Sequence, residues 1–200
     1  FRGAHPELLD RLLSEHLASL SAAGVIDLDE VVQDGMRVRA SAGSASYRRR
    51  RTLRKELTKA RRLVARLTRE RDDDPAASNR RIAAARQRAA RERAGRVRAA
   101  LDKLDEIEAE RERRAKTNKG QVAKQKEPRA STTDAQARVM KMADGGYRPA
   151  YNCQLATVAE GQIVVEADVV AVGSDRGLLR PMVERIEQRH ERRPKRYLVD

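Results

Sequence analysis

The chain has 200 residues, of which 37% are charged and only 2% aromatic, and its formal net charge is +14. A cationic surplus of this size favours a polyanionic partner, either nucleic acid or an acidic membrane surface. The single cysteine, Cys153, excludes an internal disulfide framework and a Cys-based zinc site. No apolar run approaches the roughly 20 residues that a membrane span needs. We therefore expect no membrane partner and, because a lone cysteine suits a reducing compartment, a cytoplasmic location.

The first 46 residues predict a helix, a strand and a linker. Leucines recur at intervals of three and four between residues 5 and 23, which indicates an amphipathic helix that Gly24 ends. Residues 30–39 are predicted to form a half-buried strand, because apolar side chains alternate with arginines. The alternating apolar positions are Met36, Val38 and Ala40, and the arginines are Arg37 and Arg39. The small residues at 40–46 read as a linker.

Residues 47–116 have a different pattern, which predicts an antiparallel pair of long helices. The first helix has a heptad seam with spacings of four and three, and Asp72-Asp73-Asp74-Pro75 ends it. Its seam residues are Leu53, Leu57, Ala60, Val64 and Leu67. The second helix has a weaker seam, expected at Ile82, Ala85, Ala89, Val97, Ala100, Leu104 and Ile107. Residues 48–71 contain 12 Lys or Arg and only 2 Glu, so we expect a basic arm that projects from a domain.

The last third of the chain predicts further strands after a connector at 117–146. Residues 147–158 and 163–172 have strand character and are separated by Glu160-Gly161, so they predict a hairpin. Ser174 is expected to cap a helix that ends near His190. Arg196 to Asp200 then form a short apolar strand that ends in a carboxylate.

The order of these elements predicts an α/β fold with a mixed sheet. Without the helical pair, the order is strand, strand, strand, helix, strand, which is the start of an RNase H-like fold. In that fold a crossover helix returns the fourth strand parallel to the first. Neighbouring strands lie about 4.8 Å apart, so Asp34 and Asp200 could share a divalent cation. Taken singly, Asp34 before a glycine also fits a turn or bulge, and Asp200 also fits a simple strand end.

Three segments of the sequence form a distinctive set. The longest is KEPRASTTD (126–134) with its continuation ARVMKMADGGYRPAYN (137–152). The others are Asp34-Gly35 followed by VRAS (38–41), and RPKRYLVD (193–200). Together these segments resemble bacterial insertion-sequence DDE transposases, in the branch of the family that inserts a charged helical segment after its first catalytic strand.

The resemblance implies a function and a set of site residues. It makes Asp34 and Asp200 the first two catalytic acids and metal ligands, with Mg²⁺ or Mn²⁺ as the cofactor of the complete enzyme. The third acid of the family is a Glu downstream of the second Asp, so we expect this sequence to be truncated at both ends and inactive by itself. The complete enzyme is expected to cleave and join DNA at transposon ends in the bacterial nucleoid.

Other residues are candidates for contact with DNA. Four consecutive arginines, Arg48, Arg49, Arg50 and Arg51, lie at the base of the basic arm, although a solvated coiled-coil surface explains them equally well. Arg148 and Tyr151 lie in the resembling block and are candidates for contact with transposon-end DNA, while Tyr151 also fits a core position. Asp144 is expected in a turn, and Cys153 is expected in the core. Glu166 and Asp168 are expected to face solvent.

Three functions remain open on the sequence. The first is DNA transposition, the second is a non-catalytic basic nucleic-acid-binding protein with a coiled-coil arm, and the third is a homo-oligomer built through that arm. The expected organisation is an N-terminal helical end (1–24), the first catalytic strand with its linker (25–46), the helical hairpin (47–116), a connector (117–146) and the rest of a partial RNase H-like domain (147–200).

Overall fold

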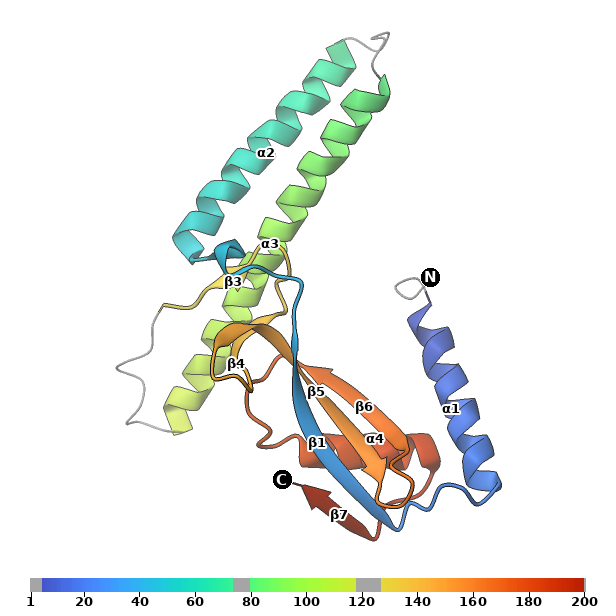
Figure 1. The fold of residues 1–200 in the computed structure, drawn as a ribbon. Coiled ribbons are helices and arrows are strands. Elements are labelled where there is room, and N and C mark those ends of the chain that lie inside the picture. Colours follow the sequence, from blue (N-terminus) through green and yellow to red (C-terminus); the bar gives the residue numbers. More distant parts are fainter. Residues whose placement is uncertain (1–4, 74–79, 118–126, 200) are drawn as a thin grey trace. The chain divides into compact units, whose positions relative to one another are not determined.

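The computed structural model describes residues 5–73, 80–117 and 127–199, and the chain folds as two compact units (Figure 1). One unit comprises residues 1–38 and 140–200, and the other comprises residues 39–139. The first unit contains most of a mixed sheet with two helices, whereas the second contains a long helical pair. None of the described helices is both long and apolar enough to cross a membrane.

Five described strands form the mixed sheet. The strands are β1 (Glu30–Arg39), β4 (Arg138–Lys141), β5 (Tyr147–Val158), β6 (Val164–Val170) and β7 (Arg196–Val199). The order is β4-β5-β1-β7, with β6 paired to β5. β5 and β6 are antiparallel, as the hairpin prediction requires, and β7 is parallel to β1. The α4 helix (Leu179–His190) connects β6 to β7, which confirms the predicted order of strand, helix and parallel strand.

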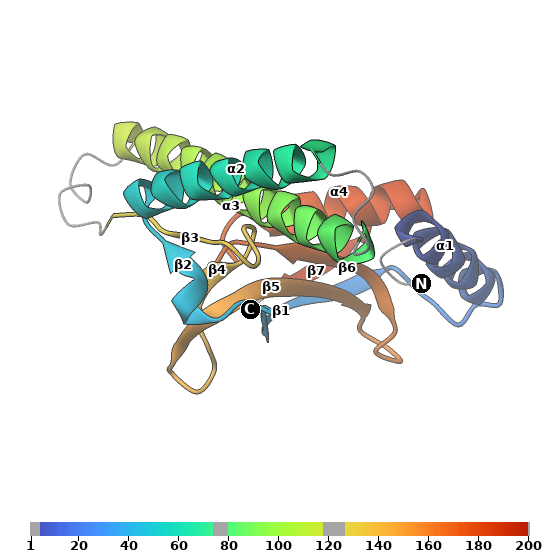
Figure 2. The same cartoon turned by 90° about the horizontal axis from the view of Figure 1, so that it is seen from above.

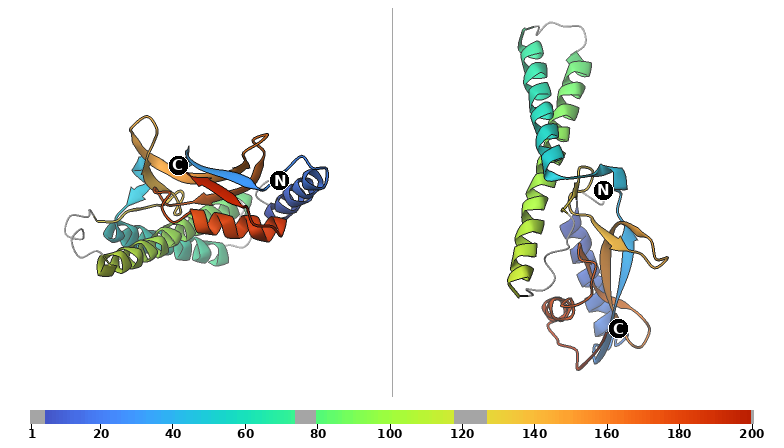
Figure 3. Two further views of the ribbon diagram at one scale, coloured as in Figure 1. Left: turned by 90° about the horizontal axis from the view of Figure 1, so that it is seen from below. Right: turned by 90° about the vertical axis from the view of Figure 1, so that its left-hand side faces the viewer.

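Two helices cover one face of this sheet (Figure 3). These are α4 and α1 (Pro6–Ala22), the latter with Pro6 in its first turn, where a missing N–H costs little. Apolar side chains from both helices and three strands form one core. They are Leu17, Ile26, Leu28, Val31, Ala156, Val158, Val165, Met182 and Ile186. The predicted ends of both helices agree with the structure, but Ser174 does not cap α4, whose N-cap is Leu178.

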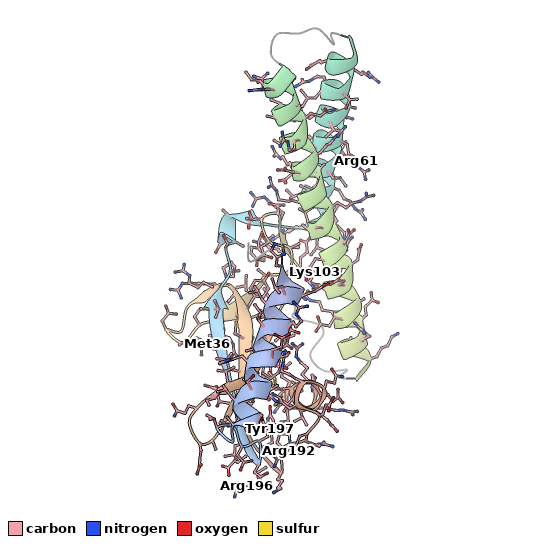
Figure 4. All side chains as sticks on the ribbon, turned by 90° about the vertical axis from the view of Figure 1, so that its right-hand side faces the viewer. Met36, Arg61, Lys103, Arg192, Arg196 and Tyr197 are labelled. Atoms are coloured by element: carbon pink, nitrogen blue, oxygen red, sulfur yellow. The ribbon has the colours of Figure 1, made fainter. Side chains whose placement is uncertain are left out.

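The prediction for the buried face of β1 was wrong. Met36 and Val38 are 53% and 42% exposed, whereas Val31 and Gln33 are buried. Met36 is labelled in Figure 4. Arg37 is half-buried on the same face as Val31, because its guanidinium donates hydrogen bonds to Asp175 and to the Gly173 carbonyl. Hydrophobicity alone therefore assigns the wrong face, since a paired arginine replaces an apolar residue there.

The prediction that Glu166 and Asp168 face solvent was also wrong. Glu166 is 2% exposed and Asp168 is half-buried. A register shift beside Ala156 and Thr157 places both Val165 and Glu166 on the covered face. Glu166 there receives hydrogen bonds from Arg189 of α4 at 2.7 and 3.2 Å.

The second unit contains α2 (Arg50–Asp73) and α3 (Arg80–Thr117), which lie side by side (Figure 2). They are antiparallel, because Arg50 contacts Glu108 near one end and Gln87 donates to Thr68 near the other. The helix α2 ends at Asp73, as the acidic Pro-containing segment predicts, and Asp74 and Pro75 lie outside the described residues. The connector was predicted without strands, yet it contains β4 and β3 (Ala130–Ser131), which pairs with β2 (Tyr47–Arg48).

The seam between the two helices confirms one prediction and corrects another. Leu53, Val97 and Leu104 are buried at 0 to 2% exposure, as the heptad pattern predicts. In the first half of α3, however, Gln87 and Ala90 are buried, whereas Ile82 is 52% exposed and Ala85 and Ala89 are exposed. Spacings of three and four counted back from Val97 reach 94, 90 and 87, so a continuous heptad selects these positions.

Candidate functional site

Asp34 lies inside β1 and not in a turn, on the side of the strand opposite Gln33 and Gly35. Its carboxylate is exposed, and one of its oxygens accepts a hydrogen bond from the Gly35 N–H at 2.6 Å. In the parallel ladder, Gln33 is the register partner of Val199. Asp200, the other predicted acid, lies outside the described residues. Among the described residues, no group of three or more His, Cys, Asp or Glu side chains gathers in a way that could hold a metal ion.

Gly35 is required by close packing on the covered face of β1. A Cβ atom at this position would lie 2.2 Å from Gln154 Nε2 and 2.6 Å from Asp175 Oδ1. It would also lie 3.1 Å from Asn152 Oδ1. Any other residue at position 35 therefore forces these polar groups apart, which explains why the residue after Asp34 is a glycine.

The side chains next to Gly35 form a polar cluster that consists of Gln33, Arg37, Asn152, Gln154 and Asp175. Asn152, Gln154 and Gln33 are buried at 0, 2 and 5% exposure. Asp175 Oδ1 accepts hydrogen bonds from Asn152 and Gln154, each at 2.7 Å, and Asp175 Oδ2 accepts one from Arg37 at 3.0 Å. Gln33 Nε2 in turn donates to Gln154 Oε1 at 2.6 Å. The polar cluster thus joins β1, β5 and the loop after β6.

The electrostatics of the polar cluster keep Asp175 ionised. Burial raises the pKa of Asp175, but hydrogen bonds from Asn152 and Arg37 and the positive charge of Arg37 lower it more. The net pKa therefore lies below the ordinary value for an aspartate. A carboxylate that accepts several hydrogen bonds is stabilised in its charged form, so Asp175 is an anion near neutral pH.

A cavity of about 510 Å³ adjoins the polar cluster and extends to Asp34 and Val199. Gln33, Gln154 and Asp175 contribute to its wall. The Oε1 atom of Gln33 is buried and has no hydrogen-bond partner among the described residues. A buried acceptor without a partner is unfavourable for stability, so the position of this oxygen calls for an explanation other than stability.

Three of the four consecutive arginines at the base of the arm, which were predicted to contact DNA, form ion pairs within the second unit. Arg50 pairs with Asp105 at 2.7 Å and with Glu108 at 2.9 Å, and hydrogen bonds to these carboxylates raise its pKa. Arg48 pairs with Glu56 at 3.6 Å, and Arg49 pairs with Glu127 at 3.2 Å. Only Arg51 is exposed without an ion pair to another described residue. The base of the arm is therefore largely neutralised.

Arg148 and Tyr151 both lie on β5. Arg148 pairs with Asp144 at 2.7 Å, and Asp144 also accepts a hydrogen bond from the Gly146 N–H at 3.0 Å. Asp144 therefore belongs to the turn between β4 and β5, as predicted, and Gly145 has the positive φ of 80° that such a turn uses. Tyr151 is half-buried on β5, as is Cys153.

The polar cluster was not among the predicted site residues, although the sequence contains a signal for part of it. Asn152 and Gln154 share the covered face of β5 with Ala156 and Val158, and all four are buried. Two amides in the buried set of an alternating strand indicate a buried polar network. Asp175 has no comparable signal, because only the folded loop brings it to the sheet. Comparisons with family models, curated proteins and solved structures found no match to this chain.

Proposed function

We propose that this chain is part of a DDE transposase and that Asp34 and Asp200 are two of its metal-binding carboxylates. The observation that carries the proposal is the parallel ladder of β1 and β7, in which Gln33 is the partner of Val199. Asp34 and Asp200 directly follow these partners in the sequence, and the proposal is that their two carboxylates share one ion. The strand order and the crossover through α4 agree with an RNase H-like arrangement and support the proposal further.

The residues at this position suit Mg²⁺ or Mn²⁺. Both ions prefer hard oxygen ligands, and the exposed carboxylate of Asp34 provides them on the open side of β1. A bound divalent ion would activate the attacking oxygen and stabilise the leaving oxygen of a phosphodiester. The protein's own contribution in this proposal is to hold Asp34 on the open side of β1, next to β7. The family's third acid follows the second Asp in the chain, so Glu184 and Glu187 do not take that role.

Metal binding tests this proposal directly on the 200-residue chain. Mn²⁺ broadens NMR signals near its binding site even at millimolar affinity, so we expect selective broadening of the Gly35 and Val199 amides. Asp34→Asn should abolish this broadening and leave the rest of the spectrum unchanged. Asp102→Asn, an exposed residue on α3 with the same change in charge, is the matched control and should bind Mn²⁺ as the parent does. Unaltered broadening in Asp34→Asn would refute the site.

The distribution of charge on the helical pair supports a second function, the binding of duplex DNA. Residues 61–70 of α2 and 81–98 of α3 carry many exposed arginines but only two acidic residues, Glu70 and Glu92. We call these arginines the distal basic surface: Arg61, Arg62, Arg66, Arg69, Arg81, Arg86, Arg88, Arg91, Arg93, Arg96 and Arg98. Arg61 projects from α2 into solvent (Figure 4). Acidic residues are concentrated instead on the later part of α3, from Asp102 to Glu112.

This segregation favours the distal basic surface over Arg48 to Arg51 as the place that contacts phosphates. Each phosphate contact releases a counterion, so affinity for DNA should fall steeply with salt. The seam of the helical pair is already buried within one chain, since Leu53, Ala100 and Leu104 are fully buried. The arm therefore needs no second copy to cover its apolar seam, which favours DNA contact over a coiled-coil dimer.

Fluorescence anisotropy with a labelled duplex tests the assignment. Replacement of Arg61, Arg62, Arg66 and Arg69 by Gln should weaken binding by about tenfold or more. It should also reduce the slope of log K against log salt by roughly 0.9 for each phosphate that the variant no longer neutralises. The matched control replaces Arg11, Arg176, Arg180 and Arg193, four exposed arginines of the other unit. An equal loss in both quadruple variants would mean that net charge, and not this surface, drives binding.

A further inference from the structure

The polar cluster interrupts an otherwise apolar face. On the covered side of the sheet, Val31, Ala156 and Val158 pack in the apolar core, whereas Gln33, Asn152 and Gln154 continue the same face in polar form. Buried amides gain little net stability even when they are hydrogen-bonded, and apolar groups of the same shape often serve equally well. Stability alone therefore does not account for three buried amides and a carboxylate at this end.

The polar cluster packs against the β1 backbone at Gly35. Gln154, Asp175 and Asn152 occupy the space where a side chain of residue 35 would lie. Arg37 adds a hydrogen bond from its Nη1 atom to the Gly35 carbonyl oxygen at 3.4 Å. A glycine within a strand is conformationally permissive. Here the packed side chains and the hydrogen bond from Arg37 restrict the backbone of Gly35 on the covered side of β1. The residue that precedes it is Asp34, whose carboxylate is turned toward the Gly35 N–H.

The polar cluster also contains a buried hydrogen-bond acceptor that has no partner among the described residues. Gln33 Oε1 is buried without a partner among the described residues, next to a cavity that extends to Asp34. Gln33 donates a hydrogen bond to Gln154, and Gln154 donates one to Asp175. The orientation of the Gln33 acceptor therefore depends on the whole cluster. A network optimised only for stability would satisfy this atom internally.

We infer that Arg37, Asn152, Gln154 and Asp175 are positioning residues, which fix the β1 backbone at Asp34 and Gly35 so that the Asp34 carboxylate is held ready for a divalent cation. The inference rests on the proposed function, because it assigns these residues a role toward the ion that Asp34 binds. Hydrogen-bonded groups behind a metal ligand typically change metal affinity by about 10- to 100-fold when they are replaced. None of the four touches the ion; they act through the backbone of β1.

The test separates metal affinity from stability. In the double variant Asn152→Leu with Gln154→Met, apolar side chains of similar size replace the two amides. We expect it to fold, with an unfolding midpoint in urea near that of the parent chain, and to bind Mn²⁺ at least about tenfold more weakly, as measured by broadening of the Gly35 amide. The control Val165→Ala lies in the apolar core. It should lower the unfolding midpoint and leave Mn²⁺ affinity unchanged.

A second variant, Asp175→Asn, keeps the side-chain volume and removes the charge that pairs with Arg37. It should also bind Mn²⁺ about tenfold more weakly, and Asp175→Glu should restore part of the affinity. Parent-like Mn²⁺ affinity in folded cluster variants, combined with the absence of binding in Asp34→Asn, would overturn this inference and leave the proposed function standing. Unchanged binding in Asp34→Asn would instead overturn the proposed function. Failure of both cluster variants to fold would overturn the inference too, since the cluster would then be structural only.

Discussion

The two ends of the covered sheet face differ in what they contribute. At one end, Val31, Val158, Met182 and Ile186 pack as fully buried apolar side chains between the strands and the helices. At the other end, Asn152, Gln154 and Asp175 form a hydrogen-bonded network against Gly35. Apolar burial stabilises without regard to direction, whereas hydrogen bonds fix particular atoms in place. The difference indicates that one end of the sheet contributes mainly to the stability of the fold, whereas the other end fixes the position of the β1 backbone at Gly35.

The largest effect is expected from the ion pair at the apolar end. Arg189→Met would leave Glu166, which is 2% exposed, without its main partner. Removal of one member of a buried pair typically costs about 3–5 kcal/mol, and urea unfolding at neutral pH measures it. Arg180→Met, which breaks an exposed pair with Glu184, is the control and should cost less than about 1 kcal/mol. Equal costs would mean that Glu166 is not effectively buried.

The same pair predicts a dependence on pH. Burial raises the pKa of Glu166, but hydrogen bonds from Arg189 and the Ala167 N–H lower it more, so the folded-state pKa lies below the ordinary value. The contribution to the free energy of unfolding is therefore complete above the unfolded-state pKa of about 4.3 and is lost as pH falls through the folded value. Unfolding curves between neutral and acidic pH should show this loss of stability. The Arg189→Met variant should lose less stability over the same range of pH.

The next effect contrasts the two ends. Ile186→Ala removes a fully buried side chain from the apolar core and should cost about 2–5 kcal/mol. At the polar end, Gln154→Met should cost less than about 1.5 kcal/mol, because volume is conserved. If Gln154→Met costs as much as Ile186→Ala in urea unfolding, the polar end contributes stability to the same degree and the contrast fails.

The smallest effect concerns the glycine against which the polar cluster packs. Gly35→Ala should cost about 1–3 kcal/mol, because its Cβ would overlap Gln154 and Asp175. Gly43→Ala is the control, since nothing lies within 4 Å of a Cβ there and its φ is −78°. That substitution should be neutral or stabilise by about 0.4–1 kcal/mol. A Gly35→Ala variant with unchanged stability would show that the side chains of the polar cluster move aside at little cost in free energy.

Local sequence patterns predicted where helices and strands occur better than they predicted which side of each strand is buried. The heptad spacing from Leu53 to Leu67 and the strand hairpin at Glu160-Gly161 both agree with the structure, because each depends on neighbours along the chain. The covered face of β1 was predicted wrongly, because the position of Arg37 depends on Asp175, 138 residues away. The buried state of Glu166 likewise depends on Arg189 and on a register shift that no local pattern indicates.

The sequence by itself determined the order of the long helices and of β1, β5, β6 and β7, the basic character of the helical pair and the candidacy of Asp34. These follow from periodicity, composition and the identity of single residues, which are properties of short stretches. Only the tertiary structure placed Asn152, Gln154 and Asp175 against Gly35 and showed Arg48, Arg49 and Arg50 to be paired with carboxylates. Burial and hydrogen bonding arise between residues that are distant in sequence, so the close packing of polar side chains against a glycine appears only when the chain is folded.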